Sequence, residues 1–72
     1  LSPRLPEFNE YNGKGDRALR SKDYNTAVKE FEKAYTILPR ELETQLSFGR
    51  ALAYSGQLDR AISLLETYNK FK

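Results

Sequence analysis

The apolar residues of this chain recur at helical spacing along most of its length, and no segment alternates between apolar and polar residues as a half-buried strand would. The clearest run comprises Ala27, Val28, Phe31, Ala34, Tyr35 and Leu38. A later segment has on its inner side Leu42, Leu46, Gly49, Leu52 and Ala53, and the last segment carries Ala61, Ile62, Leu65 and Tyr68. These runs predict an all-α fold of four helices, at about residues 7–21, 23–38 and 40–54 and from residue 58 onward.

Prolines, glycines and short polar turns separate the predicted helices. Residues 1–7 are expected to form an extended leader, although Pro6 fits the first turn of a helix, where its missing N–H has no partner to lose. Asp23 is a suitable N-cap for the second helix, and Pro39 ends that helix because the residue before a proline is disfavoured in the α conformation. Gly56 tolerates the positive φ that often follows a helix. Connections this short predict antiparallel helical hairpins.

The chain also repeats itself with a period of 34 residues. Shifting it by that length superimposes Gly15 on Gly49, Tyr24 on Leu58, Ala27 on Ala61, Val28 on Ile62 and Phe31 on Leu65. A repeat of this length is the signature of a helical solenoid. A glycine inside a helix costs about 1 kcal/mol relative to alanine, so Gly13 and Gly15 are expected to serve close packing.

The two copies resemble tetratricopeptide repeats, whose pattern is Trp, two residues, Leu-Gly, two residues, Tyr, then Ala, three residues, Phe, and finally Pro. The first copy has at these places Tyr11, Lys14, Gly15, Ala18, Ala27, Phe31 and Pro39. The second copy has Gln45, Phe48, Gly49, Leu52, Ala61 and Leu65. The resemblance covers residues 8–72, with repeat one at about 8–41 and repeat two at about 42–72. It implies two antiparallel helix-turn-helix hairpins stacked as a right-handed solenoid fragment.

Two positions depart from the family's pattern. Lys14 stands where the family has a leucine, which makes the first hairpin polar at that point. Tyr68 stands where the first copy has Ala34, a residue that lets the following repeat pack closely. Either the array ends after the second repeat, or something other than a standard repeat covers the fourth helix.

In this family the first helices of successive repeats line a concave groove that holds a peptide or a partner's helix. The positions that correspond to this groove are Asn9, Asn12, Asp16, Leu19 and Arg20 in the first helix and Glu43, Leu46, Ser47, Arg50, Ala53 and Tyr54 in the third. Arginine and tyrosine are frequent energetic anchors of interfaces. The resemblance therefore implies a scaffold or adaptor module whose partner is another protein or a peptide.

Arg20 and Arg50 are the candidates for holding an acidic group of a ligand through bidentate hydrogen bonds. The alternative is that Arg50 pairs with Asp16, which lies at the matching position one repeat earlier and would contribute about 0–1 kcal/mol. The family's lysine–asparagine clamp for chaperone peptides is not matched, because its first three places hold Asn12, Asp16 and Ser47. Binding of chaperone tails is therefore not expected.

The last helix supports a second hypothesis, which is self-association. Repeat arrays generally need about three units before their core is adequately covered. With two units, Ile62, Leu65, Tyr68 and Phe71 are expected to form a partly uncovered apolar face. The chain would then form a homo-oligomer through its fourth helix.

Composition narrows the function classes further. The chain has no histidine and no cysteine, so it lacks the usual general base, thiolate nucleophile and zinc ligands. The carboxylates are scattered with no nucleophile or phosphate loop near them, and we expect no enzyme activity, cofactor or metal site. The chain also has no methionine, so it is expected to be a fragment or a processed product, and its compartment is left open.

Charge and hydropathy bear on nucleic acids and membranes. The 12 basic and 10 acidic residues give a net charge of +2, too small to indicate nucleic-acid binding. Lys14, Arg17, Arg20 and Lys22 make the first helix locally basic, which suits a solvated face, an acidic partner or RNA. No apolar run approaches the length that crosses a bilayer, so no membrane insertion is expected within this segment.

Overall fold

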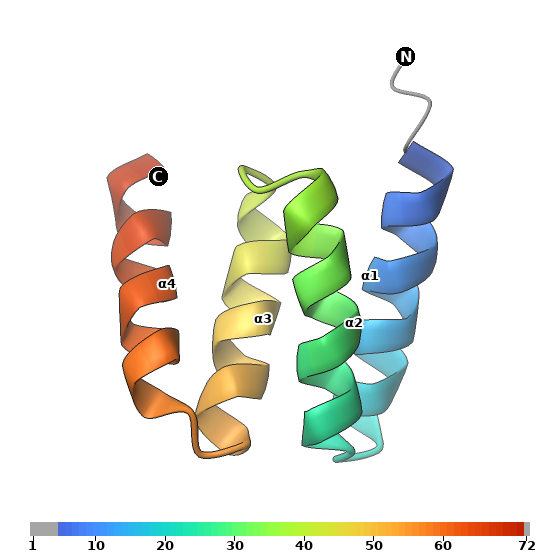
Figure 1. Ribbon diagram of the computed structural model, residues 1–72, viewed down its shortest axis with the longest axis horizontal. Helices are drawn as coiled ribbons and strands as arrows, with labels where there is room; N and C mark the ends of the chain where they lie inside the picture. Colours follow the sequence, from blue (N-terminus) through green and yellow to red (C-terminus); the bar gives the residue numbers. More distant parts are fainter. Residues whose placement is uncertain (1–4, 72) are drawn as a thin grey trace.

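The computed structural model describes residues 5–71, and of Phe71 the backbone alone. Its helices are α1 (Leu5–Arg20), α2 (Tyr24–Ile37), α3 (Leu42–Tyr54) and α4 (Leu58–Phe71). They stand side by side as two antiparallel hairpins, α1 with α2 and α3 with α4 (Figure 1). The predicted all-α fold of four helices in hairpins is confirmed.

Local sequence signals set the helix ends to within two residues of the prediction. α1 begins at Leu5 with Pro6 in its first turn, so the extended leader expected over residues 1–7 is wrong for residues 5–7, and residues 1–4 lie outside the described residues. Asp23 caps α2, since its carboxylate accepts a hydrogen bond from the Thr26 N–H at 3.4 Å. Glu41 caps α3 by accepting from the Thr44 N–H at 3.0 Å, which moves the start of α3 to Leu42.

The two hairpin loops are built alike, 34 residues apart. The Asp23 N–H donates to the Ala18 carbonyl, and the Gln57 N–H donates to the Leu52 carbonyl, both at 2.8 Å. These bonds close each helix as a Schellman motif, in which one residue takes a positive φ. That residue is Gly56 in the second loop, with φ 91°, and Lys22 in the first, with φ 65°.

Close approach within each hairpin depends on a glycine. A Cβ atom on Gly15 would lie 2.7 Å from Cδ1 of Phe31, and one on Gly49 would lie 3.0 Å from Cδ2 of Leu65. The prediction of close packing is therefore confirmed at Gly15. It is wrong for Gly13, where the nearest atom would be Nη1 of Arg17 at an ordinary 3.5 Å.

All of the helices α1 to α4 contribute buried residues to the core, and α3 supplies much of it. Tyr35 of α2 and Phe48 of α3 pack with their ring centroids 5.6 Å apart. The buried side of α3 comprises Thr44, Gln45, Phe48, Gly49, Ala51 and Leu52. Leu46, which the apolar pattern places on the inner side, is instead 41 % exposed. The reason is that neighbouring helices cover the side of α3 that carries Thr44 and Gln45.

Hydrogen bonds of Thr44 and of the Gln45 Nε2 atom offset part of the cost of that burial, whereas Oε1 of Gln45 is buried without a partner. The Thr44 hydroxyl donates a hydrogen bond to Oδ1 of Asn12 at 2.9 Å, which ties α3 to α1. Gln45 is fully buried, and its Nε2 donates to the Pro39 carbonyl in the loop between the hairpins. None of the helices within residues 5–71 is long and apolar enough to span a bilayer.

Candidate functional site

A cavity of about 410 Å³ lies between α1 and α3, at the end where both helices finish. It is lined by Asp16, Leu19, Arg20, Lys22, Tyr24, Ser47, Arg50 and Tyr54. We call it the loop-end cavity, because Lys22 belongs to the first hairpin loop. It brings together six members of the predicted groove, namely Asp16, Leu19, Arg20, Ser47, Arg50 and Tyr54.

The remaining members of the predicted groove lie outside the loop-end cavity. Asn9 and Glu43 are exposed, Leu46 is an exposed leucine, and Ala53 is half-buried. Asn12 has a structural partner, since its Oδ1 accepts the hydrogen bond from Thr44. Asn12 therefore helps to hold α1 against α3, whether or not a ligand is bound.

Charged groups in the loop-end cavity have no partners within residues 5–71. Ion pairs in this part of the chain join other residues: Lys14 with Glu10, Lys33 with Glu30 and Arg60 with Glu32. The expected alternative, a pair between Asp16 and Arg50, does not form among the described residues. The cavity thus presents Arg20, Lys22 and Arg50 with their donors open.

Two tyrosines form the aromatic edge of the loop-end cavity. The rings of Tyr24 and Tyr54 pack with centroids 5.0 Å apart and planes inclined by 37°. Tyr54 is 55 % exposed, while Tyr24 is half-buried. Sequence reasoning did not assign Tyr24 or Lys22 to the groove, because both depend on how the loop returns past α3. The feature of the sequence that could have pointed to Lys22 is its place in the basic cluster beside Arg20.

The basic cluster expected along α1 does not form one surface. Lys14 lies 3.1 Å from the Glu10 carboxylate, and the hydrogen bond to Glu10 raises the pKa of Lys14 above its ordinary value. Arg20 and Lys22 line the loop-end cavity, whereas Arg17 is exposed elsewhere on α1. The cluster therefore divides into a paired lysine and an arginine on the helix surface and two open cations at the helix end.

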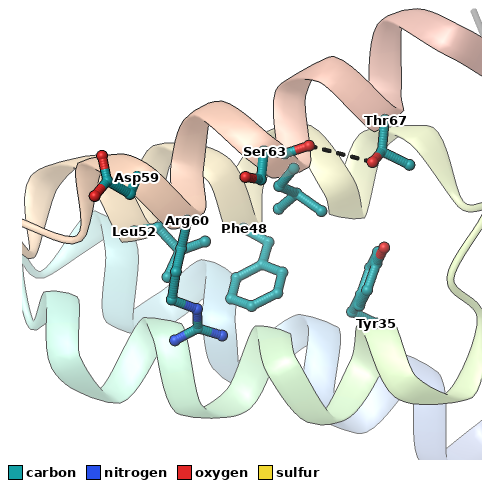
Figure 2. Close-up of a pocket in the computed structure, with 8 residues that line it drawn as sticks. Tyr35, Phe48, Leu52, Asp59, Arg60, Ser63 and Thr67 are labelled. Carbon is teal, nitrogen blue, oxygen red and sulfur yellow. Dashed lines mark hydrogen bonds between the residues drawn. The ribbon is translucent and has the colours of Figure 1, made fainter.

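A second cavity, of about 380 Å³, lies on the other side of α3, between α2 and α4 (Figure 2). Its lining comprises Tyr35, Phe48, Leu52, Asp59, Arg60, Ser63, Leu64 and Thr67. Arg60 crosses it from α4, with its guanidinium carbon 5.9 Å from the Phe48 ring centroid and Nη2 3.7 Å from the Glu32 carboxylate of α2. Nη1 of Arg60 also donates to Oε1 of Gln57 at 2.8 Å. Arg60, the cation that lines this second cavity, thus already has partners in Glu32, Gln57 and Phe48.

The outer side of α4 leaves apolar side chains uncovered. Within residues 5–71, the backbone of α4 lies close to that of α3 and of no other helix, and the Arg60 side chain alone forms an ion pair with α2. Ile62 is 56 % exposed, whereas its counterpart Val28 in the first repeat is 7 % exposed because α3 covers α2. Leu65 and Tyr68 are half-buried, and the Phe71 side chain lies outside the described residues.

Comparison with known proteins gives one positive result. The family model described as Tetratricopeptide repeat matches residues 18–72, which include both hairpin loops and all of α2, α3 and α4 as the structure describes them. Neither the search of curated proteins nor the search of solved structures returned a match. The family match agrees with the repeated loops and the repeated glycine contacts.

Proposed function

The chain belongs to the tetratricopeptide repeat family, and we propose that it holds a peptide or a partner's helix in the groove between α1 and α3. Repeats of this family form protein-interaction modules in general. The observation that supports the groove is the set of open side chains at its loop end, above all Arg50 and Tyr54. Arginine and tyrosine anchor interfaces more often than other residues do.

The test begins with selection of binding peptides from a random display library, with the 72-residue chain as bait. Selected peptides are then titrated against Arg50→Glu and Tyr54→Ala. We expect each variant to bind at least about 30-fold more weakly, as for an interface anchor of about 2 kcal/mol. Fluorescence anisotropy gives the affinities, and circular dichroism checks that the helices persist.

Lys29→Glu is the matched control, because Lys29 is exposed on α2 and lines neither cavity. It makes the same change of charge as Arg50→Glu. We expect it to bind the selected peptides as the unaltered chain does. If Arg50→Glu and Tyr54→Ala also bind normally, the groove between α1 and α3 is not the binding site.

A second candidate function is self-association through the outer side of α4. Its support is the contrast between Ile62, which is open, and Val28, which the next helix covers. A further helix on α4, supplied by a second copy, would cover Ile62 in the same way. Sedimentation equilibrium over a dilution series measures this: a folded monomer at every concentration excludes it.

A further inference from the structure

The side chains around the loop-end cavity are rich in donors and poor in acceptors. Arg20, Lys22 and Arg50 bring cationic donors from α1, the first loop and α3, and none of these groups has an ion pair or side-chain hydrogen bond within residues 5–71. The hydroxyls of Tyr24 and Tyr54 also have no hydrogen-bond partner in this part of the chain. Among the lining residues, Asp16 carries the one carboxylate. An ionised carboxylate accepts hydrogen bonds and donates none, so it complements this surface.

The backbone of Lys22 is a second, independent observation. Lys22 takes a left-handed conformation, φ 65°, at the position where the second repeat has Gly56 with φ 91°. A side chain in this conformation costs free energy that glycine avoids, and such residues cluster at functional sites. The first hairpin loop therefore carries an ammonium group at the position where the second hairpin loop has a glycine.

We propose that the loop-end cavity is a subsite for acidic side chains, and that the partner enters it with a segment rich in aspartate and glutamate. This inference rests on the proposed function, since it names the chemistry of the segment held in the groove. Arg20 and Arg50 bind the carboxylates in bidentate fashion, and Lys22 adds a point charge beside them. Tyr24 and Tyr54 contribute hydroxyl donors and apolar ring surface at the edge.

The aromatic edge favours a peptide over a single-stranded nucleic acid. Proteins that bind single strands stack successive bases on open aromatic rings. Tyr24 and Tyr54 instead pack on one another at 5.0 Å, and the whole chain carries a net charge of only +2. An acidic peptide needs the donors and one apolar contact, both of which this cavity offers.

The first test asks which peptides the chain selects. Sequences recovered from the random library by the unaltered chain should be enriched in aspartate and glutamate. The Arg20→Gln, Arg50→Gln double variant should lose that enrichment. Selected peptides without acidic enrichment whose binding Tyr54→Ala weakens would overturn the acidic subsite and leave the proposed groove standing. If no peptide is recovered, both the subsite and the groove are contradicted.

The second test uses one recovered peptide, labelled with fluorescein, and a copy in which each acidic residue becomes its amide. We expect the amide copy to bind at least about tenfold more weakly, and the acidic peptide to lose affinity between 0.1 M and 1 M salt, as the Debye length falls from about 10 Å to about 3 Å. Equal binding of the two peptides overturns the proposal. The proposal is also overturned if the chain binds a single-stranded RNA oligonucleotide or a phosphoserine peptide and does not bind the acidic peptide.

Single substitutions then test whether the acidic side chains of the peptide bind in the loop-end cavity. Arg50→Gln and Lys22→Gly should each weaken the acidic peptide by about five- to tenfold, whereas Asp16→Asn should strengthen it by about two- to fivefold because a repelling charge is removed. Lys29→Gln removes the same charge away from the cavity and should change the affinity less than twofold. Equal losses in Lys29→Gln, Arg50→Gln and Lys22→Gly would show a general charge effect and overturn the subsite.

Discussion

The helical glycines of this chain differ in what an added methyl group would contact. On Gly15 it would lie 2.7 Å from Cδ1 of Phe31, whose side chain is fully buried. We expect Gly15→Ala to lower the free energy of unfolding by about 1–2 kcal/mol, because the overlap with the ring outweighs the gain of about 1 kcal/mol in helix propensity. Urea denaturation followed by circular dichroism measures the change.

Gly13→Ala is the matched control on the same helix, since its methyl group would meet only Nη1 of Arg17 at 3.5 Å. We expect it to raise the free energy of unfolding by up to about 1 kcal/mol. Gly49→Ala should fall between the two, because the atom it approaches, at 3.0 Å, is the end of the flexible Leu65 side chain. A Gly15→Ala protein as stable as Gly13→Ala would contradict the packing of Phe31.

Lys22 gives a prediction in which stability and binding move in opposite directions. Its φ of 65° costs about 1–2 kcal/mol relative to glycine, part of which glycine's greater freedom in the unfolded chain offsets. We therefore expect Lys22→Gly to raise the free energy of unfolding by about 0.5–1 kcal/mol while it weakens binding of acidic peptides. Urea denaturation checks the first part, and a less stable variant would contradict it.

At the scale of whole helices, the sequence predicts where each begins and ends better than which side it buries. The caps Asp23 and Glu41 and the breaker Pro39 act through their immediate neighbours, so the boundaries are readable from the chain. The buried side of α3 depends on other helices. Thr44 is buried because Asn12, on α1, accepts its hydrogen bond, and no local pattern predicts that partner.

α4 should be the least protected of the helices. In the described part of the chain the backbone of α4 lies against α3 alone, whereas that of α2 lies against both α1 and α3. We expect the amides of α4 to exchange with solvent at least about tenfold faster than those of α2, because the opening of α4 breaks fewer contacts. Native-state hydrogen exchange by NMR measures both helices in one sample. Equal protection of α2 and α4 would contradict this.

At the scale of the whole molecule, the open side of α4 makes oligomeric state the property to measure. Ile62→Glu is the suitable substitution, because Ile62 is exposed, whereas Leu65 packs against Gly49 and its replacement would also disturb the hairpin. If the chain pairs through α4, Ile62→Glu should shift its dimer to monomer in sedimentation equilibrium with helicity unchanged. Leu46→Glu, an exposed leucine on α3, is the control and should leave the dimer in place.

The candidate site was predictable in some of its members and not in their pairing. The repeat positions placed Asp16, Arg20, Arg50 and Tyr54 on one side of the molecule, and the structure gathers them around one cavity. Whether Arg50 turns to Asp16 depends on side-chain rotamers that a sequence does not specify. Lys22 joins the site through a loop conformation that glycine usually adopts, which is why composition and periodicity did not reveal it.

The matching loops also make an unusual pair of isomers available. Exchanging the two residues, Lys22→Gly together with Gly56→Lys, yields a protein with the same amino-acid composition, the same mass and the same formal charge as the original. The exchange moves one ammonium group from the first hairpin to the equivalent place on the second. A difference between these isomers in binding an acidic peptide is then a difference of position alone, which no salt titration of a single chain can isolate.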